Sequence, residues 1–285
     1  MKFKIIGSHD HAMSGVPQII EALKKLGHEI VDSDADVLYH PTGFFEDLFE
    51  AVPANPRALK VGCLLDANPL NPDWPEEKVA LQLSNLDIAL TISETARQQI
   101  LKRTGQDTKV VYYPIKPIVS KNYMRGVDFL TVGRIYSENK RFNLVDAFLK
   151  AVSFNRDLLI VAGPEKPPFG YYTGLLPTET LNELYNSAKY LLFFSSHEGL
   201  GLSAIEAIVA GCTPILCSDN ECVKELGLED FSADPNPISL ASKLKEMEEN
   251  RSVFLEKINI LRGKFLAQFS AEAVAKNILD AILNK

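Results

Sequence analysis

Residues 193–219 read FFSSHEGLGLSAIEAIVAGCTPILCSD, and this stretch decides the fold of the chain around it. Its first apolar residues are typical of a buried strand, and a glycine-containing loop is followed at once by a helical pattern. Ser203 and Glu206 have the S-x-x-E spacing of a capping box, which predicts where the helix starts. Gly211 is the expected C-cap, and a second apolar run after it predicts the next strand.

The loop before this helix has the composition of an anion site. Gly199 and Gly201 lack the side chains that would keep a ligand away from the backbone. The N–H groups of the first helical turn and the positive end of the helix dipole would suit a diphosphate. Two interpretations stay open for each glutamate. Glu206 is either a capping residue or a ligand residue, and Glu198 is either a solvated loop residue or part of a site.

Short apolar runs alternate with helical patterns along the whole chain. The expected strands are residues 3–6, 29–31, 37–39, 60–65, 88–92, 110–113, 129–132, 158–162, 190–194 and 213–217. The expected helices are residues 16–26, 142–153, 178–188, 203–210 and 238–250, with two more amphipathic helices after them. Further helices are expected between the strands from 37–39 to 110–113. This alternation predicts parallel sheets that are covered by helices on both faces.

A break in the alternation predicts two domains. Residues 114–127 (PIKPIVSKNYMRGV) contain two prolines and a glycine and lack periodicity, so we interpret them as a linker. The predicted fold is an α/β protein of two Rossmann-like domains, 1–118 and 119–269, with parallel sheets facing across a cleft. A C-terminal helix at 270–285 is expected to pack back on the first domain. Open parallel sheets bind ligands at the carboxyl ends of their strands, which places the expected site at those ends.

The overall composition narrows the class of protein. The chain has 285 residues, 46% of them hydrophobic and 24% charged, as globular proteins do. The formal net charge of -7 argues against nucleic acid as a partner. Four irregularly spaced cysteines predict reduced thiols, with neither a disulfide scaffold nor a zinc site. The first apolar stretch is too short for a signal peptide, and no run approaches a transmembrane segment, so a cytoplasmic protein is expected.

The loop and helix resemble the signature of the retaining glycosyltransferases of family 4 (glycosyl transferases group 1), which have the GT-B fold. That motif, E-G-[F/L]-G-L-x-x-x-E-A-x-A-x-G-x-P-V, stands here as residues 198–202, Glu206-Ala207, Gly211 and Pro214-Ile215. Val132-Gly133-Arg134, followed six residues later by Lys140, resembles the V-G-R…K segment of the same family. A third block, residues 172–189, completes a resemblance that is strong over 128–220.

The resemblance implies a role for each of these residues. Arg134 and Lys140 would hold the donor diphosphate and offset charge on the leaving nucleotide; without Glu198 they would be interpreted as solvated cations. Glu198 would bind sugar hydroxyls near the reacting face, and Glu206 would accept hydrogen bonds from the ribose. The glycine loop would contact sugar and phosphate through the backbone of Gly199, Leu200, Gly201, Leu202 and Ser203.

The resemblance also implies roles for further residues. Gly174 and Leu175 would border the base, or form an ordinary turn, and Gly15 would face donor phosphate and acceptor. Many relatives have a histidine after the fourth strand, whereas residues 63–68 here read CLLDAN. The acceptor-side candidates are His9, His11, His40, Asp66 and Asn68.

The resemblance therefore predicts a hexosyl- or related glycosyltransferase that moves a sugar from a nucleotide diphosphate sugar to a hydroxyl acceptor with retention of anomeric configuration. The donor is expected to be linked to UDP or GDP. No metal and no other cofactor are expected, because cationic side chains would stabilise the leaving group. Two other functions fit the same residues: a non-catalytic or regulatory nucleotide-sugar-binding protein, and another GT-B enzyme such as a nucleotide-sugar epimerase.

Overall fold

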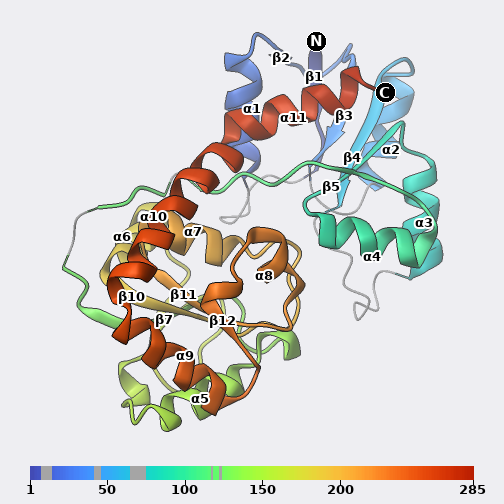
Figure 1. Ribbon diagram of the computed structural model, residues 1–285. Coiled ribbons are helices and arrows are strands. Elements are labelled where there is room, and N and C mark those ends of the chain that lie inside the picture. The colour runs from blue at the N-terminus through green and yellow to red at the C-terminus, as the bar shows by residue number, and fades with distance from the viewer. Residues whose placement is uncertain (8–14, 42–45, 65–74, 117, 122–123) are drawn as a thin grey trace. The chain divides into compact units, whose positions relative to one another are not determined.

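The chain forms two compact units, each built on a sheet of six parallel strands with helices around it (Figure 1). The computed structural model describes residues 1–7, 15–41, 46–64, 75–116, 118–121 and 124–285. Unit 1 consists of Met1–Pro114 and Gln268–Lys285, and unit 2 consists of Ile115–Ala267. The predicted α/β class with two parallel sheets is confirmed.

In unit 1 the strands are ordered β2-β1-β3-β4-β5-β6 across the sheet. Their bounds are β1 (Lys2–Ile5), β2 (Glu29–Ile30), β3 (Val37–His40), β4 (Leu59–Leu64), β5 (Ile88–Thr91) and β6 (Lys109–Val110). The helices of this unit are α1 (Val16–Lys25), α2 (Glu46–Ala51), α3 (Glu76–Ser84), α4 (Glu94–Thr104) and α11 (Ala271–Leu283), with a 3-10 turn η1 (Val52–Ala54).

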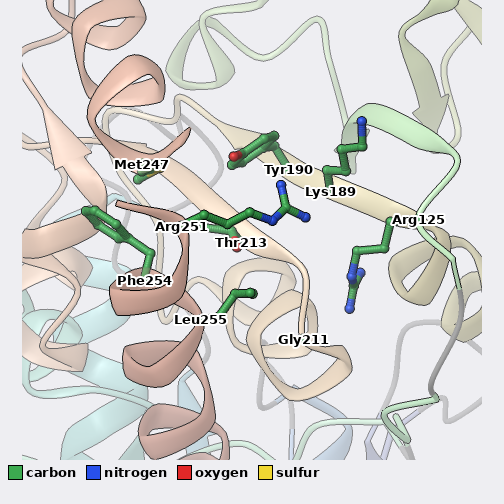
Figure 2. A pocket seen from close by; sticks show the side chains of 9 residues that line it. All are labelled: Arg125, Lys189, Tyr190, Gly211, Thr213, Met247, Arg251, Phe254 and Leu255. Atoms are coloured by element: carbon green, nitrogen blue, oxygen red, sulfur yellow. The ribbon is translucent and has the colours of Figure 1, made fainter. Parts of the chain in front are cut away.

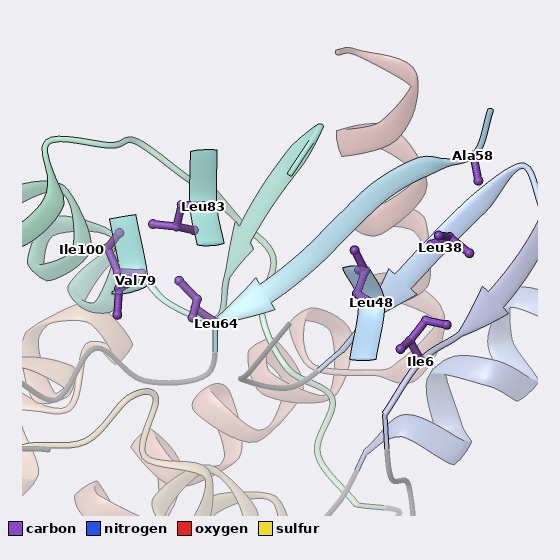
Figure 3. Packing of buried hydrophobic residues seen from close by; sticks show 8 residues of the cluster. All are labelled: Ile6, Leu38, Leu48, Ala58, Leu64, Val79, Leu83 and Ile100. Atoms are coloured by element: carbon purple, nitrogen blue, oxygen red, sulfur yellow. The ribbon is translucent and has the colours of Figure 1, made fainter. Parts of the chain in front are cut away.

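The core of unit 1 lies where helices cover one face of this sheet. Figure 3 shows Leu64, at the end of β4, beside Val79 and Leu83 of α3 and Ile100 of α4. All four side chains are less than a tenth exposed. Burying a large apolar side chain stabilises the fold by about 1.5–3 kcal/mol, so this cluster fixes α3 and α4 on the sheet.

The C-terminal helix α11 belongs to unit 1, where it packs against α1. Its carboxyl end is capped from the sheet, because the ammonium of Lys109 donates to the carbonyls of Ala281 (3.1 Å) and Asn284 (2.9 Å). A cation at this position satisfies carbonyl groups that have no partner within the helix and opposes the helix dipole.

In unit 2 the strand order is β12-β11-β10-β7-β8-β9. The bounds are β7 (Val127–Val132), β8 (Ile160–Ala162), β9 (Tyr171–Gly174), β10 (Ala188–Phe193), β11 (Thr213–Cys217) and β12 (Ser232–Ala233). The helices are α5 (Phe142–Ala151), α6 (Thr178–Ser187), α7 (Leu202–Ala210), α8 (Glu221–Leu226), α9 (Pro237–Glu249) and α10 (Arg251–Gln268), and the 3-10 turns are η2 (Glu138–Lys140), η3 (Arg156–Leu158) and η4 (Glu229–Phe231). Among the described residues, no helix is both long and apolar enough to cross a membrane.

The structure contains elements that the sequence pattern did not predict. The edge strands β9 and β12 and the short helix α8 were not expected, because short or half-exposed elements carry little periodicity. The expected strand at 110–113 was too long. Strand β6 ends at Val110, and one further backbone bond, from Val111 to Thr91, extends the pairing before Pro114.

The segment predicted as a linker is anchored to unit 2 where the structure describes it. Two buried asparagines of α6 hold its backbone: Asn182 accepts from the N–H of Val119 (3.0 Å), and Asn186 accepts from the N–H of Lys121 (2.5 Å). Asn186 also donates to the carbonyl of Val119 (2.9 Å). Side chains therefore supply the hydrogen bonds that a strand or helix would otherwise supply.

Arg125 joins two helix ends at the amino edge of the unit 2 sheet. Its guanidinium donates to the carbonyls of Tyr185 (3.0 Å), Ala188 (2.5 Å) and Ala210 (3.0 Å), at the ends of α6 and α7. A pocket of about 10 Å³, room for roughly one water molecule, lies beside it. Figure 2 shows the lining residues, which are Arg125, Lys189, Tyr190, Gly211, Thr213, Met247, Arg251, Phe254 and Leu255.

We expect Arg125→Ala to lower the free energy of unfolding of unit 2 by at least about 3 kcal/mol, because it removes three hydrogen bonds to a charged group, each worth about 1.5–3 kcal/mol. Urea denaturation measures the change. Arg156→Ala is the matched control, since its half-exposed guanidinium pairs with Asp146 (3.0 Å) at the surface and should contribute less than about 1 kcal/mol. Equal losses in the two variants would contradict the capping role of Arg125.

Candidate functional site

The carboxyl edge of the unit 2 sheet brings together most of the residues expected to form the donor site. Strand β10 pairs in parallel with β7, so the loops that follow these two strands lie next to each other. Arg134 and Lys140 follow β7, and Glu198 follows β10. Gly174 ends β9, two positions farther along the same sheet.

Two glycines let the loops after β7 and β8 approach each other at this edge. Gly133 has φ 121° and donates its N–H to the carbonyl of Ala162 (2.8 Å). A Cβ at Gly163 would lie 2.1 Å from the carbonyl oxygen of Gly133, which no side chain can occupy. The backbone contact therefore requires glycine at position 163.

A carboxylate orders the segment that contains Arg134. Glu165 accepts hydrogen bonds from the N–H groups of Ile135 (2.8 Å) and Tyr136 (3.0 Å). These two bonds and the positive charge of Arg134 lower the pKa of Glu165. The side chain of Arg134 itself is exposed, so it can meet a ligand at the surface of unit 2.

Lys140 and Glu198 form a hydrogen-bonded ion pair. The ammonium of Lys140 donates to Oε1 of Glu198, and the two side chains are only 21% and 17% exposed. Lys140 also lies 5.8 Å from the centre of the Phe193 ring. A Cβ at Gly201 would be 3.6 Å from the same ring, which places the ion pair close to the start of α7.

Backbone contacts fix the two loops that carry this ion pair. The side chain of Asn139 donates to the carbonyl of His197 (3.0 Å), and the N–H of Ser196 donates to the carbonyl of Asn139 (2.8 Å). On the other side, Asn220 donates to the carbonyl of Ser195 (2.9 Å). The residues that flank Lys140 and Glu198 are therefore held by hydrogen bonds between loops.

The predicted capping box of Ser203 and Glu206 is wrong. Gly201 is the N-cap residue, in a left-handed conformation (φ 78°, ψ 40°), and its carbonyl accepts from the N–H of Ala204 (2.9 Å). The helix thus begins at Leu202, and Glu206 lies too far along it to reach back to the N-cap. The N–H groups of Leu202 and Ser203 precede the first helical bonds of α7, and N–H groups at this position have no partner within a helix. The predicted C-cap at Gly211 is confirmed (φ 81°).

Glu206 lies on the buried side of α7 and is only 7% exposed. The hydroxyl of Tyr185 donates to its Oε2 (3.2 Å), and the backbone N–H of Lys116 forms a further hydrogen bond to it. Burial raises the pKa of Glu206 to about 6, and the positive charge of Lys116 opposes this shift. Ser203 in turn forms a hydrogen bond with Tyr185.

The remaining unit 2 candidates differ in their exposure to solvent. Gly174 has φ 74° and open space where a Cβ would be, and its carbonyl accepts from the N–H of Gly163 (3.1 Å). Leu175 is 60% exposed, next to this open space. Leu200 is buried, and Gly199 is half-buried, so the loop can offer Leu200 to a ligand only through its backbone.

The acceptor-side candidates belong to unit 1. His9, His11, Asp66 and Asn68 lie outside the described residues. Gly15 is the N-cap of α1 and donates its N–H to the hydroxyl of Tyr113 (3.0 Å); a Cβ here would lie 2.8 Å from Pro114. His40 ends β3 and is 4% exposed, with its Nε2 2.9 Å from where a Cβ of Gly7 would be.

Several residues of the site were not predicted from the sequence. They are Glu165, Asn139, Asn220, Tyr185, and a bidentate pair of Arg141 with Asp219. Each of these residues contacts a partner that is distant in sequence, so local patterns could not identify it. The exceptions are Asp219 and Asn220, whose position directly after a predicted strand indicated that they could lie at the site. Within the ranges that the structure describes, no group of three or more acidic, histidine or cysteine side chains could hold a metal ion.

Comparisons with known proteins identify the fold. Anabaena HepE, solved in complex with UDP and glucose, has a TM-score of 0.75 at 13% identity, over 100% of both chains. Sucrose-phosphate synthase from Thermosynechococcus elongatus has a TM-score of 0.79 at 12% identity, over 100% of this chain and 98% of that one. The fold of the chain is the GT-B fold. Residues 171–282 match the model of the family described as Glycosyl transferases group 1.

Two curated relatives match shorter stretches. O-antigen chain mannosyltransferase B of Escherichia coli is 36% identical over 72 residues, 25% of this chain and 19% of that protein. GDP-mannose:cellobiosyl-diphosphopolyprenol alpha-mannosyltransferase of Komagataeibacter xylinus is 26% identical over 142 residues, 50% of this chain and 33% of that protein. The matched stretches thus span about a fifth and a third of these relatives.

The raised pKa of Glu206 makes stability depend on pH. Burial lifts this pKa from 4.5 to about 6, so the folded state favours the protonated carboxyl. The stabilisation is complete below about pH 4.5 and is lost as the pH rises through about 6. Relative to Glu206→Gln, which does not titrate, the free energy of unfolding of the wild type should fall by on the order of 2 kcal/mol between about pH 4 and about pH 7.5. Urea denaturation at several pH values measures the difference, and a constant difference would contradict the expectation.

Proposed function

We propose that the chain is a glycosyltransferase that binds a nucleotide diphosphate sugar on unit 2 and transfers the sugar to a hydroxyl acceptor with retention of anomeric configuration. The observation that carries the proposal is the partly buried Lys140–Glu198 ion pair beside the start of α7. It combines a cation, a carboxylate and the first N–H groups of a helix at one edge of a parallel sheet. The family match of residues 171–282 and the mannosyltransferase names of both curated relatives support the same class of reaction.

The donor diphosphate would bind at the first turn of α7. The N–H groups of Leu202 and Ser203 and the positive end of the helix dipole attract an anion there. The ammonium of Lys140 and the exposed guanidinium of Arg134 supply full charges. Negative charge grows on the phosphate as its bond to the sugar breaks, and fixed cations at that point lower the barrier.

Glu198 would bind hydroxyl groups of the transferred sugar. Its carboxylate already accepts one hydrogen bond, from Lys140, and has further lone pairs for sugar hydroxyls. In the proposed retaining reaction, the acceptor oxygen forms its bond to the anomeric carbon on the face from which the diphosphate departs. The hydroxyl proton passes to the departing phosphate oxygen, so no protein base is required.

The nucleoside would lie between Glu206 and the open space at Gly174. Glu206 would accept from the ribose hydroxyls in its ionised form, which competes with the protonated form below about pH 6. HepE was solved with UDP and glucose, and the name of one curated relative specifies GDP-mannose. We therefore propose a UDP- or GDP-linked donor.

The first test is a thermal-shift panel of UDP-glucose, GDP-mannose and ADP-glucose, followed by a turnover assay with the donor that binds. A ligand at 100 times its dissociation constant stabilises the folded state by about 2.7 kcal/mol, so we expect a clear rise in Tm with one nucleotide. Binding without donor hydrolysis or transfer would instead indicate a nucleotide-sugar-binding protein. If none of the three raises the Tm, the donor site proposed on unit 2 is wrong.

We expect Lys140→Ala to lower turnover of the nucleotide sugar by about 100-fold or more, as loss of one group that stabilises transition-state charge does. Lys150→Ala is the matched control, because this lysine is exposed and pairs with Asp146 on the surface of α5. Initial rates with the donor identified above are the measurement. Wild-type turnover in Lys140→Ala would remove Lys140 from the mechanism.

A further inference from the structure

The backbone of Arg141 is strained at the edge of the candidate site. Its φ of 49° and ψ of 46° lie in the left-handed region, which is unfavourable for a residue with a side chain because its Cβ comes too close to a carbonyl oxygen. Among the described residues, Asp34 and Ser153 are the other non-glycine residues with positive φ. Of these three residues, Arg141 is the one that directly follows a residue of the candidate site, Lys140. Strain of this kind persists only where surrounding contacts determine the conformation.

The contact that holds Arg141 is a bidentate pair with Asp219. Nη1 of the guanidinium donates to Oδ1 (2.8 Å), and Nη2 donates to Oδ2 (2.5 Å). The guanidinium also forms a hydrogen bond with Cys217. The two side chains are 25% and 40% exposed, so solvent screens the pair only in part. A planar fork that meets both carboxylate oxygens fixes direction as well as distance.

This pair ties the loop after β7 to the loop after β11. Arg141 is the C-cap of η2, whose last residue is Lys140, and it is also the N-cap of α5. On the other side of Lys140, Asn139 is bonded to the loop after β10 through His197. Lys140 therefore lies between two anchored neighbours, and its backbone cannot move unless one of these contacts breaks.

We propose that Arg141 and Asp219 are a positioning pair, which holds Lys140 in place for the donor diphosphate without touching the ligand. This role rests on the proposed function. Lysine has a flexible four-carbon stem and binds phosphate as a point charge, so its placement depends on the backbone that carries it. A misplacement of about 1 Å can cost about 100-fold in rate.

Arg141→Gly separates this role from a purely structural one. Glycine adopts the left-handed conformation without strain, so the Tm should stay within a few degrees of the wild type. The pair is lost, however, and we expect kcat to fall about 10-fold or more with a smaller change in KM. Asp219→Asn should have a similar effect, and the double variant should be no slower than the slower single variant. Arg141→Lys, which keeps the charge but loses the fork, should lie between the wild type and Arg141→Gly.

The matched control is Asp107→Asn in unit 1. Asp107 makes the same kind of bidentate pair with Arg97 (2.6 and 2.7 Å) and belongs to neither the candidate site nor its loops. This variant should keep the wild-type kcat. A wild-type kcat in Arg141→Gly, or a loss of kcat in Asp107→Asn as large as that in Asp219→Asn, would overturn the proposal.

A second measurement does not require turnover. The side chain of Lys140 is 21% exposed and bonded to Glu198, so an amine-reactive reagent should label it slowly in the wild type. In Arg141→Gly the labelling rate at Lys140, followed by mass spectrometry, should rise several-fold while that at Lys150 stays constant. An unchanged rate at Lys140 would overturn the positioning role. If the wild type shows no turnover but the rate rises as expected, the proposed function fails and the positioning of Lys140 stands.

Discussion

All six strands of the unit 2 sheet run in one direction, so the loops that follow them lie at one edge of the sheet, where the candidate site is. The central strands are covered on both faces, and all five residues of β11 are buried. The charged side chains within these strands are Asp128 and Lys189, near the amino ends of β7 and β10, and they pair with each other (2.6 Å). Other charged side chains are excluded from the strands, because burial without a partner is costly. They gather instead at the carboxyl edge, where adjacent loops face each other. Lys140, Glu198 and Asp219 are far apart in sequence and close in space because β7, β10 and β11 are neighbours in the sheet.

Glu198 and Glu206 are close in sequence but have different electrostatic environments. Glu198 is paired with the ammonium of Lys140, so its negative charge is compensated where it stands. Glu206 is buried deeper and is met by a hydroxyl and a backbone N–H, with the Lys116 charge acting against the cost of burial. The result is a raised pKa for Glu206. The same residue type thus supplies a paired carboxylate for the proposed sugar contact and a titrating carboxyl for the proposed ribose contact.

Much of the fold was predictable from the sequence, because buried parallel strands give unbroken apolar runs and helices give a clear period. The start of α7 was not predicted correctly. The capping box pattern is local, whereas Gly201 can adopt a left-handed conformation and begin the helix earlier. Contacts between residues that are distant in sequence could not be predicted either. Arg141 and Asp219 are 78 residues apart, and neither belongs to a motif that suggests a pair.

The hydrogen-bond partners of the segment at 114–127 could not be predicted from the sequence either. Its prolines and lack of period correctly predicted an absence of regular structure, but they contained no sign of where its hydrogen bonds would go. The partners are Asn182 and Asn186 of α6, which themselves fit an ordinary helical pattern. An asparagine on a helix is usually exposed, so the two buried amides became meaningful only once the neighbouring backbone was in place.

The hydrogen bond from the N–H of Lys116 to Glu206 has a thermodynamic consequence. Lys116 lies in the stretch of chain that leads from unit 1 into unit 2, and a ribose bound to Glu206 would share the same carboxylate. Two events that act on one group are linked, and each changes the free energy of the other by the same amount. The position of the Lys116 backbone and the protonation of Glu206 are therefore coupled. Protonation of this carboxylate weakens the hydrogen bond from Lys116, and that hydrogen bond in turn lowers the pKa of Glu206.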